Sequence, residues 1–101
     1  MAHAILPKTY TEGSGDLPRV LRGALVALSH AKHVPHLGSA LSCIDIMIAA
    51  YWHTMNFDPK FPKDPARDRF ILSKGHAAKA LYVCLAYRGF FEIEILQKLG
   101  E

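Results

Sequence analysis

The stretch DRFILSKGHA, residues 68–77, decides the expected fold. Residues 69–72 are mostly apolar and predict a short strand, and the small and polar residues after them predict a turn. Residues 77–88 then predict a helix that ends at Gly89, and another helix is expected over 92–99. A strand, a turn and a helix in this order indicate an α/β fold. Because a single strand has two unpaired edges, we expect the chain to be the opening portion of a larger domain.

A first helix is expected over residues 17–32. Apolar residues recur there at three- and four-residue spacing, Asp16 is a suitable N-cap, and Pro35 lies just beyond the expected end. Residues 1–15 end in Thr-Glu-Gly-Ser-Gly and predict a flexible leader. The organised part is therefore expected to cover residues 16–101.

A second helix is expected over residues 43–54. Residues 34–41 predict a turn-rich connection, and Ser42 with Asp45 three positions later is a variant of the capping box. The expected helix is apolar on nearly all sides, so it needs cover from other elements. The loop over residues 56–68 contains three prolines and separates this helix from the predicted strand.

Composition excludes several classes of protein. Half of the 101 residues are hydrophobic and 21% are charged, which is typical of a globular chain. The net charge is +3, but the basic residues are scattered, so nucleic-acid binding is not expected. There is no apolar run that could span a bilayer and no signal peptide pattern, and Cys43 and Cys84 are expected to be reduced and buried. We therefore expect a cytoplasmic protein without membrane contact.

Three histidines follow one another at three-residue spacing. His30 and His33 would share one face of a helix, and a zinc site with His36 is conceivable. Pro35 takes His36 off that helix, and no acidic or cysteine ligand stands nearby to complete the set. We expect no metal ligand here, with His30 and His33 at the surface or at a helix end.

Two turns remain as candidate sites. Lys74, Gly75 and His76 lie where the predicted strand ends and a helix begins, and free N–H groups and the helix dipole favour phosphates there. The same turn could be a simple helix cap, since it lacks the P-loop pattern. His36 lies in the turn between the first two helices and, taken alone, could be an ordinary loop histidine.

Taken together and in this order, the motifs resemble the N-terminal region of transketolases, in particular the N-terminal subunits of split transketolases. The resemblance covers about residues 17–99, and SKGHA separates it from the related deoxyxylulose-phosphate synthases. It rests on HLGSALS at 36–42, Asp45-Ile46, Asp58-Pro59 and DRFILSKGHA at 68–77.

The resemblance implies a fold and a function. The fold would be the opening of a thiamine-diphosphate-binding, three-layer α/β/α domain, mostly helical within this segment. The activity would be transfer of a two-carbon ketol unit from a ketose phosphate to an aldose, as in pentose phosphate metabolism, with thiamine diphosphate and Mg²⁺ as cofactors. The partners would be the remaining transketolase domains or a C-terminal subunit, in an oligomer with active sites between subunits.

The resemblance also implies roles for individual residues. His36 matches the family histidine that lines the substrate channel and assists proton transfer, so it is the candidate catalytic residue. His76 matches the histidine that contacts the diphosphate. Gly75 and Ser39 belong to the same two turns and are the further candidate cofactor-binding residues.

The sequence departs from the family pattern at two points. Pro35 stands where the family often has glycine, which stiffens the turn before His36. The Gly-Asp-Gly stretch that binds Mg²⁺ in the family does not occur in these 101 residues, and neither does the pyrimidine domain with its activating glutamate. We therefore expect activity only together with the remaining domains; the alternative is a non-catalytic, transketolase-like segment that acts in binding or assembly.

Overall fold

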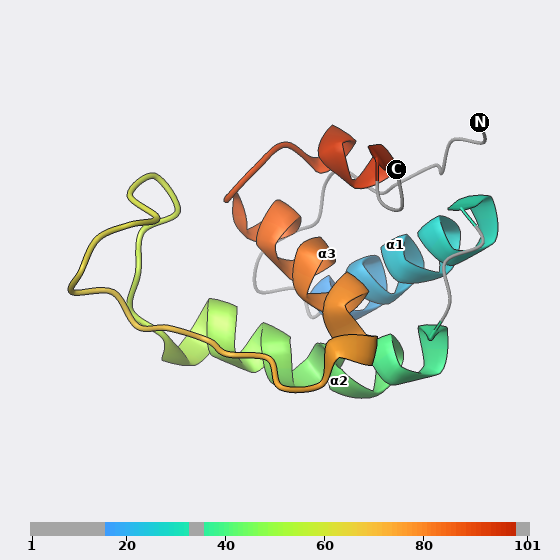
Figure 1. Cartoon of the computed structure of the whole chain (residues 1–101), viewed down its shortest axis with the longest axis horizontal. Coiled ribbons are helices and arrows are strands. Elements are labelled where there is room, and N and C mark those ends of the chain that lie inside the picture. The colour runs from blue at the N-terminus through green and yellow to red at the C-terminus, as the bar shows by residue number, and fades with distance from the viewer. Residues whose placement is uncertain (1–15, 33–35, 99–101) are drawn as a thin grey trace.

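The computed structural model describes residues 16–32 and 36–98 (Figure 1). The predicted leader, residues 1–15, lies outside the described residues. None of the helices in the described ranges is long and apolar enough to cross a membrane. The elements are α1 (Leu17–Lys32), α2 (Leu37–Ala49), a π-helical turn (Ala50–Thr54), a 3₁₀ turn (Gly75–Ala77), α3 (Ala78–Arg88) and a 3₁₀ helix (Ile93–Lys98).

The three α-helices pack against one another around one apolar core (Figure 1). Each helix places an apolar stripe toward the other two, as its three- and four-residue spacing requires. Side chains that are less than 2% exposed come from all three helices and from the final 3₁₀ helix. The largest of them are Leu21, Leu28, Ile44, Met47, Leu96, Val83 and Cys84.

The expected bounds of α1 and α3 are confirmed. The structure has α1 over Leu17–Lys32 and α3 over Ala78–Arg88, with the 3₁₀ turn leading into α3. Gly89 ends α3 in the left-handed conformation, with φ 102°, and its N–H donates to the carbonyl of Ala86. The helix expected over residues 92–99 is a 3₁₀ helix.

The expected start of the second helix is wrong. α2 begins at Leu37, and His36 rather than Ser42 is its N-cap. Proline restricts the residue before it and not the residues after it, so the helix starts soon after Pro35. Ser42 is the sixth residue of α2, and its hydroxyl donates to the carbonyl oxygen of Ser39 at 2.8 Å instead of capping the helix.

The predicted strand over residues 69–72 is also wrong for the described part of the chain, in which no residue is in a strand. Within the described ranges the backbone groups of residues 69–73 have no hydrogen-bond partner, and a strand is defined by such partners. The alternation of a strand is nevertheless present, since Phe70 and Leu72 pack on the core while Ile71 is 85% exposed. The helical part of the fold prediction is confirmed, and the sheet of an α/β domain is not among the described residues.

The π-helical turn after α2 is held to the end of α3 by one arginine. The Arg88 guanidinium lies over the rings of Trp52 and Phe57, 5.9 and 4.8 Å from their centres, and its Nε–H donates to the carbonyl oxygen of Tyr51 at 2.7 Å. The Tyr51 ring in turn contacts Phe57 and two further aromatic rings, those of Phe70 and Phe90. These contacts fasten the π-helical turn and the long loop to α3.

Both cysteines are free, as expected. Cys84 is fully buried in the helical core, and burial raises the pKa of its thiol to about 12. This thiol is therefore protonated at neutral pH and serves as a small apolar core residue. Cys43 lies on α2 and is only half-buried, so the expectation of burial is wrong for this cysteine.

Replacing Gly89 by alanine should lower the free energy of unfolding by about 1–2 kcal/mol, because a Cβ disfavours the left-handed backbone. Gly23→Ala is the matched control. Gly23 lies inside α1, a Cβ there would meet no atom within 4 Å, and the change should raise stability by about 0.5–1 kcal/mol. Urea denaturation followed by circular dichroism measures both changes, and equal effects of the two would contradict the assignment of Gly89 as the helix end.

Candidate functional site

The start of α2 and the 3₁₀ turn before α3 meet at one surface. The rings of His36 and His76 are stacked there, with their centres 4.4 Å apart and their planes at 30°. After the long loop, the chain runs back along α2 in an irregular segment. This segment leads to the 3₁₀ turn near the start of α2 (Figure 1). The two turns that sequence analysis singled out are therefore adjacent in space.

His36 reaches this position through an unusual backbone conformation. Its φ and ψ are 67° and 33°, and it is the only non-glycine residue with a positive φ among the described residues. The left-handed conformation is roughly 1–2 kcal/mol less favourable for an L-residue. Strained residues of this kind are enriched at functional sites, where the surrounding packing holds them.

A second contact joins the same two segments. The Lys74 ammonium donates to the Ser42 hydroxyl oxygen at 3.3 Å. Ser42 donates its own proton to the Ser39 carbonyl, so its lone pairs are available to the lysine. Sequence analysis gave Ser42 only a capping role; the signal that could have revealed its place is its i, i+3 spacing from Ser39, which puts both serines on one face of a helix.

Ser39 and Gly75 are placed beside these contacts. The Ser39 side chain is half-buried, and within the described residues its hydroxyl has no hydrogen-bond partner. A Cβ added to Gly75 would meet no atom within 4 Å, and its φ is not in the left-handed range. The described fold therefore does not itself require glycine at this position.

The site favours an anion. Lys74 and both imidazoles are exposed, two helical segments begin here, and helix starts present N–H groups and positive dipole ends. The acidic side chain of α2, Asp45, is engaged by Arg22 of α1 at 2.6 Å. A phosphate or diphosphate would therefore find several donors at this surface, which fits the group expected from the sequence.

Within the described residues, no group of three or more histidine, cysteine or acidic side chains is placed to hold a metal ion. His30 lies exposed in the last turn of α1, and His33 is outside the described residues. The candidate site in the described part of the chain is therefore a set of hydrogen-bond donors.

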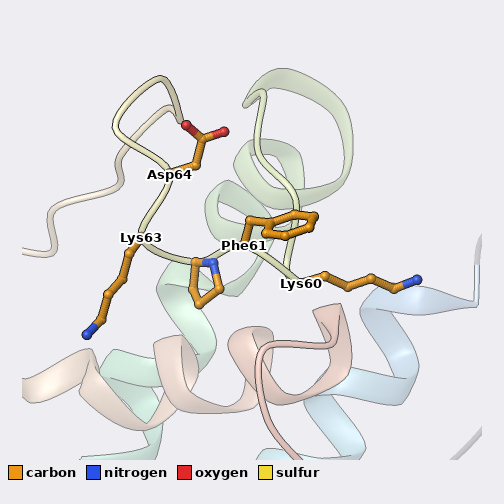
Figure 2. A pocket seen from close by; sticks show the side chains of 5 residues that line it. Lys60, Phe61, Lys63 and Asp64 are labelled. Atoms are coloured by element: carbon orange, nitrogen blue, oxygen red, sulfur yellow. The ribbon is translucent and has the colours of Figure 1, made fainter.

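A separate hollow lies on the long loop, away from the histidines. Figure 2 shows its lining, and in Figure 1 this loop is at the opposite end of the molecule from the start of α2. All of its lining residues come from one exposed turn, and none of them is a candidate site residue: Lys60, Phe61, Pro62, Lys63 and Asp64. Its surface offers no cluster of catalytic groups.

Comparison with known proteins identifies the family of the chain. Residues 17–99 match the family model "Transketolase, thiamine diphosphate binding domain", so the chain is a member of this family. The resemblance seen in the sequence is thereby confirmed. No solved structure matches the chain significantly.

The relatives include proteins named as single subunits of transketolases. The chain is 41% identical over 80 residues to an apulose-4-phosphate transketolase subunit of Phocaeicola vulgatus, covering 79% of this chain and 28% of that one. It is 47% identical over 67 residues to the 6-deoxy-6-sulfo-D-fructose transketolase subunit SqwG of Clostridium sp., covering 66% and 24%. Human transketolase is 39% identical over 82 residues, covering 80% and 13%. The match thus spans about a quarter of the two subunits and a smaller share of the human enzyme.

The stacking of the two histidines can be tested by proton NMR. A proton over the face of a stacked ring is shifted upfield, so His76→Ala should move the ring resonances of His36 downfield. His53→Ala is the control, because His53 lies exposed in the π-helical turn after α2, and its replacement should leave the His36 resonances in place. Unchanged His36 resonances in His76→Ala would contradict the stacked geometry.

Proposed function

We propose that the chain is the opening part of the thiamine-diphosphate-binding domain of a transketolase that transfers a two-carbon ketol unit from a ketose phosphate to an aldose. Its membership of the family supports the cofactor class. The observation that carries the assignment to residues is the meeting of His36 and His76 at a surface that Lys74 makes positive. This contact brings residues that are far apart in the sequence into one site with several hydrogen-bond donors.

In this proposal one side of the site holds the diphosphate. His76 donates an imidazole N–H, Lys74 supplies a positive charge, and Ser39 donates its hydroxyl proton. Gly75 leaves space for the phosphate oxygens, because its missing Cβ would point into open surroundings. When bound, thiamine diphosphate supplies the carbon nucleophile and electron sink that ketol transfer needs.

His36 lies at the other side of the stacked pair and serves the substrate. An imidazole can donate through one nitrogen and accept through the other, and both its charge forms are accessible near neutral pH. In the proposal it hydrogen-bonds the sugar and moves a proton at a sugar hydroxyl. Its left-handed backbone holds the ring at the start of α2, where it is exposed to an incoming ligand.

We further infer that the site is completed by other domains or by a partner subunit. Several relatives are named as subunits of transketolases, which supports an arrangement in more than one chain. The Mg²⁺ ligands and the activating glutamate would come from those parts, and active sites would form between subunits in an oligomer. The ketose phosphate and aldose would enter from the His36 side.

Calorimetry on the chain assembled with its complementary parts tests the proposal. Thiamine diphosphate should bind to the assembly, and Gly75→Ala should weaken binding by about tenfold, or 1.4 kcal/mol, because the added methyl group occupies phosphate space. Gly23→Ala should leave the affinity unchanged, since Gly23 lies on α1, outside both turns of the site, and an added Cβ there would meet no atom within 4 Å. Failure of the unaltered assembly to bind thiamine diphosphate would overturn the proposal in favour of a non-catalytic segment.

His36→Asn should lower the turnover number by roughly 10²–10⁴, the usual contribution of a general acid–base group. Asparagine is chosen because it tolerates the left-handed backbone better than other residues do. The affinity for thiamine diphosphate should fall much less than the turnover number, since His36 serves the sugar and affects the diphosphate only through its stacking on His76. Steady-state kinetics with a ketose phosphate donor, with His53→Asn as control, measures this; an unchanged turnover number would remove His36 from the catalytic role.

A further inference from the structure

We propose that Ser42 is a positioning residue, which holds the Lys74 ammonium in the place from which it contacts the diphosphate. The inference rests on the proposed function and extends it to a residue outside the two histidine turns. Its basis is the cross-contact between Ser42 Oγ and Lys74 Nζ, which joins α2 to the segment before α3.

Each hydrogen-bonding group of the Ser42 hydroxyl can be assigned a partner. The hydroxyl has one proton, which goes to the Ser39 carbonyl oxygen at 2.8 Å. Its lone pairs therefore face away from that carbonyl, and Lys74 donates to one of them at 3.3 Å. The Cys43 thiol, 3.7 Å from the same oxygen, is left as a further weak donor. An ammonium has three protons, so Lys74 keeps two for an anion.

A lysine side chain that is already ordered binds an anion more tightly than a mobile one. The Lys74 side chain is exposed, and ordering a lysine side chain takes up to about 2 kcal/mol of conformational entropy. The contact with Ser42 reduces this loss at the moment of binding, because the ammonium is already near its place. Ser42 thus raises affinity without touching the cofactor.

Ser39 lies in the sequence between His36 and Ser42, the two residues that contact His76 and Lys74. His36 pairs with His76 before the first turn of α2, and Ser42 pairs with Lys74 about 9 Å further along the helix axis at 1.5 Å per residue. Ser39 lies between them in sequence and on the same helix face as Ser42. Ser39, one of the donors proposed for the diphosphate, therefore lies between the residues that contact the other two, His76 and Lys74.

A purely structural role for Ser42 predicts a different effect of replacing it. Its side chain is exposed, and exposed substitutions usually change stability by less than about 0.5 kcal/mol. The bond from Ser42 to the Ser39 carbonyl lies within α2 and does not depend on Lys74. A structural effect of Ser42 would therefore be the same whether Lys74 is present or absent.

A double-mutant cycle tests the positioning role. In the assembled protein, Ser42→Ala should weaken thiamine diphosphate binding about three- to tenfold, whereas Ser42→Thr, which keeps the hydroxyl, should restore near-normal affinity. In a Lys74→Met background, Ser42→Ala should have no further effect on affinity. Calorimetry supplies the dissociation constants, and circular dichroism shows that each variant is folded.

The outcomes separate the two proposals. If the unaltered assembly does not bind thiamine diphosphate, the proposed function fails and the inference on Ser42 fails with it. If the unaltered assembly binds but Ser42→Ala binds equally well, only the positioning role is overturned. The same holds if Ser42→Ala weakens binding as much in the Lys74→Met background as in the unaltered chain, or if Ser42→Thr is as weak as Ser42→Ala.

Discussion

The stacked contact between His36 and His76 is the interaction on which the site depends. It requires α2 to begin directly after a left-handed residue and the 3₁₀ turn before α3 to lie against that start. The helical core makes this possible, since α2 and α3 pack on each other and on α1. Lys74 and Ser42 hold the same two segments together a short distance further along α2. A small helical core thus presents a surface of hydrogen-bond donors.

The same architecture leaves backbone groups and apolar side chains uncovered in the described part of the chain. The segment over residues 69–73 has the in-and-out alternation of a strand but no hydrogen-bond partner in the described ranges. Ile71 and Ile46 are 85% and 67% exposed, although α2 was expected to need cover on nearly all sides. Unpaired backbone groups and exposed isoleucines are the features that further strands and helices of a larger domain would cover. The chain covers 28% and 24% of the two transketolase subunits among its relatives.

Local rules determine some elements of this fold, and contacts between distant residues determine the others. The apolar spacing of α1 and the glycine at the end of α3 are local, and the bounds of both helices were predicted. The start of α2 depends on one left-handed residue, His36, which no local rule identifies. The strand required a partner that the described residues do not contain. That His36 and His76 serve one site was expected only from the family resemblance, while their stacked contact and the contact of Ser42 with Lys74 were visible only in three dimensions.

The central claim is that this surface receives the diphosphate of thiamine diphosphate. A crystal structure of the assembled protein with thiamine diphosphate measures this directly, through the distances from the diphosphate oxygens to His76 and to the Lys74 Nζ. We predict distances of about 2.7–3.2 Å, the range of N–H···O hydrogen bonds. A diphosphate bound elsewhere, with His76 and Lys74 facing solvent, would contradict the claim.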